Sequence, residues 1–414
     1  MRCMKYFLFL LIGFMLCSSG PAFAGVDLEG INIGGALRVQ YGYKDWDEAS
    51  KDKGGDFAFD TFRLSANGEI GEMILSAEYR WYPEYDFDTI HHGWIGYNFN
   101  EHWQAQIGVH QVPFGIQPYA SHNFWFSGAY YVGLEDDYDM GIKALYNDGP
   151  LSLSLAFYKN GELGSSADAG RYSVDILNYE YPDDITPITV KGVDKDGKEV
   201  DIVVDNVVDN EQFDQNNEET NQGNIRLAYT ISHNDTCSTE IGLSGEYGGI
   251  RNSDTNETGD HWAGAIHMVG NYGRWNIQLE GIQYEYDPEN PDETNKDVLY
   301  GGAYSYVWGL PLKAHIGTFN VAYGLPVDIG PISKLTFYSD NTIIQADNEG
   351  KDWDQTWQNV VGCMISAGPV YTYIDIISAE NMPFMGGSMV DNADGWQSSN
   401  NRNTRININV GYYF

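Results

Sequence analysis

The feature that most constrains the fold is an alternation of apolar and polar residues, in blocks of about ten. In the block LSLSLAF, residues 151–157, three leucines and a phenylalanine fall on one face of an extended strand, while two serines and an alanine fall on the other. Similar blocks run from residue 29 onward, cut by Gly, Asn, Asp and Pro, and no window carries a sustained helical stripe. In a soluble β-sandwich the second face would pack against another sheet. Small and polar residues on that face instead favour a water-filled barrel interior.

The blocks number sixteen, and single-chain bacterial barrels have an even number of strands. Short turns alternate along the chain with long polar connections. The segment 297–323 is overlong and is interrupted at residues 309–311 (GLP), and we interpret it as one bulged strand; eighteen strands are the alternative. The sequence therefore predicts an all-β fold, a transmembrane antiparallel β-barrel. Its strands are expected near residues 29–44, 56–68, 70–82, 87–99, 102–111, 138–147, 150–160, 224–233, 237–250, 261–272, 273–286, 297–323, 332–346, 355–367, 369–380 and 402–414.

The first 24 residues predict a secretory signal peptide. Arg2 and Lys5 precede an apolar stretch at residues 6–17, and the small-residue pattern AFA at residues 22–24 suits cleavage. Twelve apolar residues are too few to cross a bilayer as a helix, so an anchor helix is the weaker interpretation. Residues 25–414 are then expected to form one barrel in the outer membrane of a Gram-negative bacterium.

The charge balance excludes one class of partner. The chain holds 59 acidic and 23 basic residues, a formal charge of −36, which does not suit a surface that binds nucleic-acid phosphates. An aromatic content of 14% is too high for a disordered acidic tail. Beyond the signal peptide only Cys237 and Cys363 remain, and we expect two separate thiols rather than a bridge.

Strand parity predicts which charges face the lumen. A lysine or arginine on the lipid face costs about 2–4 kcal/mol at the membrane midplane, so basic residues in the strands are expected to point inward. Avoidance of lipid accounts for this placement; the alternative is that these bases also line the pore and act on solutes. The predicted inward bases are Arg38, Arg63, Arg80, Lys143, Arg226, Lys313, Lys334 and Arg405. The inward acids by the same rule are fewer, namely Glu78, Glu240, Glu246, Glu280 and Asp375.

Two long connections have different compositions. Residues 112–137 form the candidate constriction loop, whose acids Glu135, Asp136 and Asp137, with Asp139 just after it, would set up a transverse field against the basic wall. Its aromatic residues are expected to pack the loop against the wall, and a stacking track for sugar rings is the alternative. These aromatics are Tyr119, Phe124, Trp125, Phe126, Tyr130 and Tyr131.

Residues 161–222 contain 16 acidic and 4 basic residues and predict a long, solvated surface loop. Its segment 194–199 (DKDGKE) is too short for an EF-hand, so the sequence predicts solvated charge there; an ion site, or weak bridging of the acidic loops by divalent ions, is the alternative.

Three segments carry a resemblance to a known family. Residues 108–115 (GVHQVPFG), the hairpin at 62–71 (FRLSANGEIG) and the strand at 94–97 (WIGY) resemble Gram-negative porins, most closely the phosphate-selective porin O/P-like family. The resemblance covers the N-terminal third well and the rest by architecture. It implies a sixteen-stranded, trimeric barrel with residues 112–137 folded into the pore. Phosphate specificity in that family needs a dense arginine ladder and a lysine cluster, which this chain lacks, so we do not carry it over.

The strand at 405–414 also resembles the terminal strand of bacterial outer-membrane barrels. That resemblance implies recognition of Phe414 by the barrel assembly machinery. The other expected partners are outer-membrane lipid and small hydrophilic solutes.

No catalytic motif stands out. The chain has no G-x-S-x-G, H-E-x-x-H, Walker or C-x-x-C pattern. His91 and His92 are adjacent within one strand, so their rings are expected on opposite faces. The sequence therefore predicts an outer-membrane porin for passive diffusion of small hydrophilic solutes and ions, with no cofactor and no enzymatic activity. The alternatives are a channel selective for a sugar or ion, and a barrel-borne hydrolase or adhesin.

Overall fold

The computed structural model describes residues 30–164, 169–178, 187–193, 199–205, 215–291, 298–347, 353–390 and 401–414. The predicted signal peptide lies outside these residues. Among them, no helix is long and apolar enough to cross a membrane.

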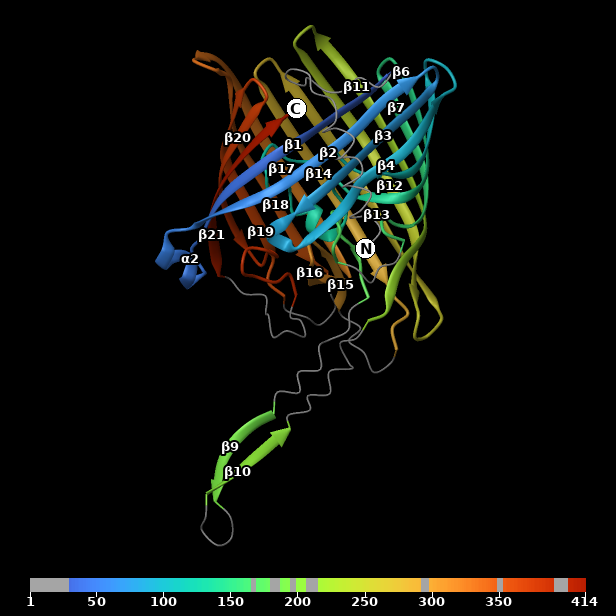
Figure 1. Ribbon diagram of the computed structural model, residues 1–414. Coiled ribbons are helices and arrows are strands. Elements are labelled where there is room, and N and C mark those ends of the chain that lie inside the picture. The colour runs from blue at the N-terminus through green and yellow to red at the C-terminus, as the bar shows by residue number, and fades with distance from the viewer. Residues whose placement is uncertain are drawn as a thin grey trace, which may run out of the picture.

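Sixteen antiparallel strands form one closed barrel, which confirms the predicted architecture and strand number (Figure 1). The first and last strands close it, with Leu37 opposite Tyr412. In wall order the strands are β1 (Ile31–Lys44), β2 (Asp56–Ile70), β3 (Met73–Tyr82), β4 (Phe87–Asn98), β5 (Trp103–Gln111), β6 (Tyr138–Asp148), β7 (Leu151–Gly161), β11 (Asn217–Asn234), β12 (Cys237–Asn252), β13 (Thr258–Tyr272), β14 (Trp275–Asp287), β17 (Lys313–Ile329), β18 (Ile332–Ala346), β19 (Thr356–Ala367), β20 (Val370–Glu380) and β21 (Arg402–Tyr413).

The two faces of the wall differ as the alternation predicts. Leu227 and Leu243 pair across β11 and β12 and are 42% and 58% exposed on the outside. Their neighbours Arg226 and Ser244 pair on the inner face and are buried. An apolar exterior around a polar interior is the pattern of a barrel that faces lipid.

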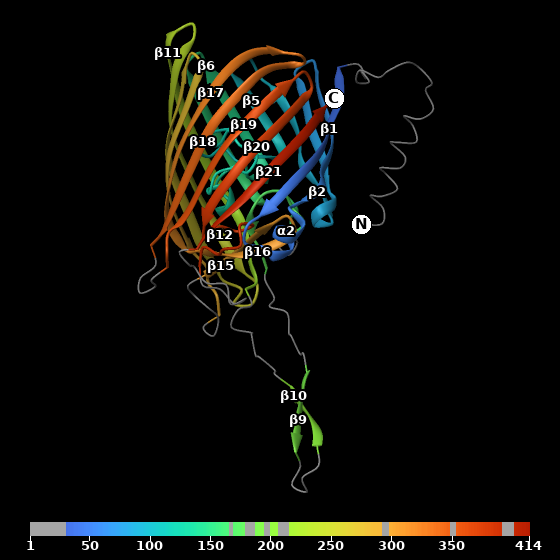
Figure 2. The ribbon, with the colours of Figure 1, turned by 90° about the vertical axis from the view of Figure 1, so that its left-hand side faces the viewer.

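The connections differ at the two ends of the barrel. Short turns join strands at the end where β1 begins and β21 ends, and the longer connections leave the opposite end (Figures 1 and 2). The longer ones include the helix α2 (Glu48–Lys53) and the single turn η1 (Pro83–Tyr85).

The prediction of one bulged strand over residues 297–323 is wrong. Its first part folds as β15 (Val298–Ala303) and β16 (Tyr306–Pro311), which form a three-stranded sheet with β8 (Asp175–Ile176), separate from the barrel. Only the remainder enters the wall, as β17. Every residue of β15 is buried, because this hairpin packs with the loop at 112–137 in one apolar core. A strand apolar on both faces fits a site covered on both sides.

Part of the predicted acidic surface loop is not at the surface. The connection between β7 and β11 spans residues 162–216, and residues 171–177 of its segment 169–178 are buried, with Tyr172, Val174 and Ile176 at most 4% exposed. Later in this connection, β9 (Pro187–Val193) and β10 (Glu199–Asp205) pair as a separate two-stranded sheet. Most of the segment 194–199 lies outside the described residues.

The expectation for the adjacent histidines is also wrong. The pairing of β3 with β4 shifts at Glu78/Tyr79, so that Glu78 pairs with His92 and Tyr79 with Ile90. His91 is the extra residue of this bulge, and its Nδ1 lies 2.8 Å from Nδ1 of His92. A bulge places two consecutive side chains near each other, which simple alternation cannot predict. Cys237 and Cys363 are free, as expected.

Candidate functional site

Residues 112–137 lie inside the barrel, where they contact a long arc of its wall. The contacts begin at Gly115, whose amide donates to Ser244 Oγ at 3.0 Å and whose carbonyl accepts from Arg226 Nε at 2.7 Å. The amide of Ile116 donates to Glu280 Oε1 at 2.8 Å. Gly115 has φ of +55°, which strains other residues, and a Cβ there would lie 2.2 Å from Glu280 Oε1, so the Glu280 side chain would have to move away from the loop.

Asp340 of β18 is the most connected wall residue beneath the loop. Its Oδ2 accepts from the amides of His122 and Asn123 at 2.6 and 3.1 Å, and from Asn123 Nδ2 at 2.8 Å. His122 Nδ1 lies 2.7 Å from Asp340 Oδ1, and His122 Nε2 lies 2.7 Å from Asn276 Oδ1. These contacts fix the middle of the loop to β14 and β18.

Two further wall strands hold the next part of the loop. The amide of Phe124 donates to Asp375 Oδ2 on β20 at 3.3 Å, and Gln358 Nε2 on β19 donates to the carbonyl of Phe126 at 2.9 Å. The single turn η2 (Tyr130–Val132) follows. The loop therefore covers the inner wall from β11 to β20.

A cavity of about 320 Å³ remains between the loop and the opposite wall. Arg38, Arg63 and Arg80, from β1, β2 and β3, line it together with all six predicted loop aromatics. Asp60 and Asp136 are the acids among its described lining residues. Basic wall residues and aromatic loop residues thus line the same cavity.

The arginines of this region stack on aromatic rings. The guanidinium carbon of Arg38 lies 4.5 Å from the ring centre of Phe124, and that of Arg80 lies 4.4 Å from the ring centre of Tyr172. Arg405 lies in the same way 4.2 Å from the ring centre of Trp125. Such cation–π contacts hold the guanidinium planes in place.

Acids offset part of this positive charge. Arg38 Nε lies 2.9 Å from Asp60 Oδ2, Arg80 forms an ion pair with Glu78, and Arg63 Nη1 lies 3.9 Å from the same Glu78 carboxylate. Three guanidinium groups therefore share two wall carboxylates here.

The other predicted inward bases lie away from the cavity. Lys143 Nζ donates to the carbonyl of Gln111 at 2.7 Å, and Arg226 holds Gly115. Lys313 lies 3.6 Å from Glu285, and Lys334 is exposed near the short turn between β17 and β18. These bases do not line the space that the loop leaves open.

Strand parity missed several inward acids, and the reasons differ. Asp60 lies at a register shift between β1 and β2 that reverses its face. Glu219 was missed because β11 begins at Asn217, before the start of the expected strand. Asp340 has the same parity as Lys334, so the parity rule could have identified Asp340 as an inward acid. With these three acids added, the wall no longer carries an excess of bases.

The predicted loop acids have three different environments. Glu135 accepts hydrogen bonds from the amides of Ala120 and Ser127 within the loop, and burial raises its pKa to about 8. Asp136 faces the cavity and accepts from the Tyr172 hydroxyl at 2.5 Å. Asp137 and Asp139 lie outside the cavity lining, in an acidic cluster with Asp175. Of the four acids, only Asp136 faces the arginines.

The chain was compared with known proteins. A family model described as phosphate-selective porin O and P matches residues 31–310. No curated protein sequence matches the chain.

Several solved structures share its fold. OmpT of Vibrio cholerae is 11% identical, covers 95% of this chain and 100% of its own, and has a TM-score of 0.53. The anion-selective porin from Comamonas acidovorans is 11% identical over 93% of this chain and 99% of its own, with a TM-score of 0.54. The outer-membrane channel DcaP of Acinetobacter baumannii is 10% identical over 95% of this chain and 100% of its own, with a TM-score of 0.51. At such identities the likeness shows the fold alone.

The family match spans more than half of the chain, and the closed sixteen-stranded barrel agrees with it. The chain belongs to the phosphate-selective porin O and P family of outer-membrane porins.

Proposed function

We propose that solutes cross this porin through the cavity between the loop at 112–137 and the wall made by β1, β2 and β3, with the loop as the constriction. The observation that carries this proposal is the 320 Å³ space lined by Arg38, Arg63 and Arg80 inside a barrel that the loop otherwise crosses. A barrel of this size encloses an aqueous lumen, so the narrowest charged section controls passage. Solutes then move down their own gradients.

The charges of this cavity favour anions. Three arginines face Asp60 and Asp136 there, which leaves one net positive charge among the described lining residues, while Glu78 pairs with Arg63 and Arg80 from outside this lining. Charged rings and clefts of this kind select ions by sign. The charge of the whole chain, −36, does not describe the passage, because most acids lie elsewhere. We do not propose phosphate specificity, since the chain lacks a ladder of bases.

The test is reconstitution of the full chain into planar bilayers. We expect a stable ohmic conductance and, across a potassium chloride gradient, a reversal potential of the sign given by chloride permeation. Absence of any conductance would contradict the channel, while a potassium-selective current would contradict the assignment of the arginine wall as the controlling section.

The aromatic side of the cavity favours a second candidate, selectivity for small carboxylates that carry a ring. Arg38 lies over the face of Phe124, and the other aromatic rings of the lining can contact the apolar ring of a carboxylate that an arginine binds. Benzoate is then expected to reduce the chloride current at lower concentration than acetate does. Equal effects of the two anions would leave simple diffusion as the function.

The assembly is proposed to be a homotrimer. One in-vitro folded OmpT of Vibrio cholerae, a structural neighbour of this chain, was solved as a trimer form. Conductance steps in threes would support this assembly. We also propose that the signal peptide exports the chain, that the assembly machinery recognises Phe414, and that the barrel contacts outer-membrane lipid. The protein is proposed to have no enzymatic activity.

The attachment of the loop is expected to weaken as the pH rises. Burial lowers the pKa of His122, but its hydrogen bond and charge contact with Asp340 outweigh this, and the pKa is raised overall. A raised pKa means that the stabilisation is complete below about pH 6.5 and is lost as the pH rises through the folded-state value. When His122 loses its charge, the contact with Asp340 stabilises the docked loop by about 1 kcal/mol less. The state in which the loop is released from the wall should then become about fivefold more populated.

The measurement is open-channel current noise from pH 6 to pH 9. His122→Gln keeps a hydrogen-bonding side chain but cannot titrate, and it is the matched control. Noise that rises equally in the variant would assign the effect to another group, such as Glu135.

A further inference from the structure

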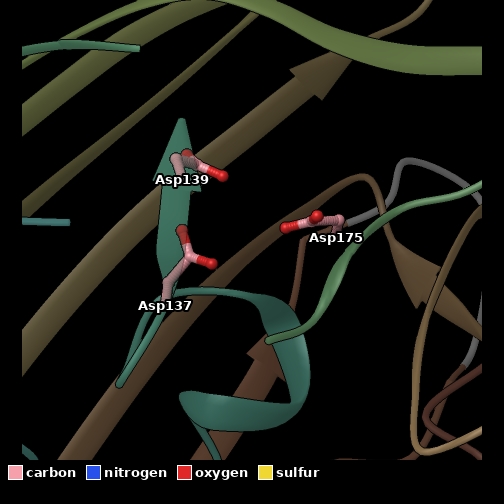
Figure 3. Close-up of side chains that lie close together, drawn as sticks. All are labelled: Asp137, Asp139 and Asp175. Carbon is pink, nitrogen blue, oxygen red and sulfur yellow. The ribbon is translucent and has the colours of Figure 1, made fainter. Parts of the chain in front are cut away.

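An acidic cluster lies beside the base of the loop, outside the cavity described above. Asp137 ends the loop, Asp139 lies at the start of β6, and Asp175 comes from the buried segment 169–178. One carboxylate oxygen from each lies within 4.8 Å of the others. Figure 3 shows Asp137 and Asp139 on one segment, with Asp175 facing them from another. The chain thus brings three carboxylates from two distant segments to one point.

The cluster carries more negative charge than its base can offset. Arg171 forms an ion pair with Asp175 and lies 3.9 Å from Glu162. The charges that act on Asp137 include those of Asp139, Asp175, Glu162 and Glu219. Buried charges are retained only when they are paired or bind a metal. Asp137 and these four acids make five carboxyl groups, and Arg171 is the base paired with them among the described residues. Arg171 can balance at most one of their charges.

Two buried oxygens in this cluster point to a ligand. Asp139 Oδ1 and Asp175 Oδ1 have no hydrogen-bond partner among the described residues, although Asp139 is only 2% exposed and Asp175 only 3%. A buried acceptor without a partner is destabilising, and a bound ion is one of the few explanations for it. Gly161 leaves the room that Asp175 needs, because a Cβ there would lie 2.3 Å from Asp175 Oδ2.

We propose that Asp137, Asp139 and Asp175 bind a calcium ion. A site of carboxylate oxygens selects hard cations. Two oxygens on one ion can be at most twice the metal–oxygen distance apart, which is about 5 Å for calcium and about 4 Å for magnesium. The three carboxylate oxygens lie within 4.8 Å of one another, which is inside the limit of about 5 Å for oxygens on one calcium ion. Water completes the coordination sphere.

The ion has a definite place in the architecture. It joins the end of the loop and the start of β6 to the segment that carries Tyr172. The Tyr172 hydroxyl bonds Asp136, and its ring lies under Arg80, so this segment forms one side of the cavity. Calcium therefore holds a wall of the passage from outside it.

The test is isothermal titration of calcium chloride into the full chain, folded in detergent and freed of divalent ions with EGTA. We expect one calcium per chain, with a Kd of about 10⁻⁵–10⁻³ M, the range from sensors to extracellular modules, and weaker binding of magnesium. Asp139→Asn combined with Asp175→Asn should raise the Kd at least tenfold. Asp148→Asn, at the exposed far end of β6, is the matched control and should bind as the unaltered chain does.

Folding of each variant is checked by its heat-dependent electrophoretic mobility. If the double variant does not fold, Asp137→Asn alone is titrated and should still raise the Kd. No calcium uptake by the unaltered chain at millimolar calcium, or equal uptake by a folded variant, would overturn the site. Conductance measured on the same preparation separates the two proposals, because a conducting channel that binds no calcium would overturn the site and leave the porin function standing.

Discussion

Replacing Arg38, Arg63 and Arg80 together by glutamine will lower the anion-to-cation permeability ratio of the channel by about tenfold, the equivalent of about 1.4 kcal/mol. The cavity then keeps Asp60 and Asp136 in its lining and Glu78 beside it, so its net charge becomes strongly negative. A single charge acts with about 1 kcal/mol at 4 Å even in bulk water, so three are sufficient for this change. The reversal potential in a potassium chloride gradient measures it.

A charge-neutral variant of the same wall provides the control. Arg38→Gln with Asp60→Asn removes the 2.9 Å ion pair without changing the net charge, so the reversal potential should stay where it is. Arg274→Gln, at the short turn before β14, removes a base far from the passage and should also have no effect. If the charge-neutral variant shifts selectivity as much as the triple variant does, local shape rather than charge controls the passage.

Asp340→Ala will release the middle of the loop and raise both the conductance and its noise. The aspartate contacts the amides and the side chains of both His122 and Asn123, and these four groups lose their partner at once. Removing one partner of a buried charged contact costs about 3–5 kcal/mol. Contacts with Glu280, Thr342 and Gln358 still hold the loop at both sides of the released part.

Single-channel recording and thermal unfolding measure the two consequences. Asp340→Asn keeps an acceptor and should show a smaller effect, and the exposed Asp328→Ala should behave as the unaltered chain. A conductance unchanged in Asp340→Ala, despite a lowered unfolding temperature, would mean that this part of the loop does not limit the current.

The barrel could be predicted from the sequence because the alternation of apolar and polar residues within each strand shows which residues face lipid and which face the lumen. Arg405 and its alternate neighbours on β21 point inward as parity requires, and the same rule places Arg38, Arg63 and Arg80 on one wall. Parity fails where a strand gains a residue, as at His91 and near Asp60, because no local pattern marks the bulge.

Apart from the loop at 112–137, the segments that fold inside the barrel could not be predicted from the sequence. The hairpin of β15 and β16 resembles a wall strand in composition, because it is covered on both faces. Segment 169–178 lies within a strongly acidic stretch, yet most of it is buried, and its one acid, Asp175, pairs with Arg171 of the same segment. The meeting of Asp175 with Asp137 and Asp139 depends on this burial. Spacing along the chain gives no sign of it.

The docking of the loop also has a consequence for the order in which the molecule assembles. The loop partners on the wall are distant in the chain, with Glu280 164 residues from Ile116 and Asp375 251 residues from Phe124. Contacts of such long range raise the contact order and slow folding, because a large segment must be arranged before they form. The C-terminal strands must therefore be in place before these contacts of the loop can form.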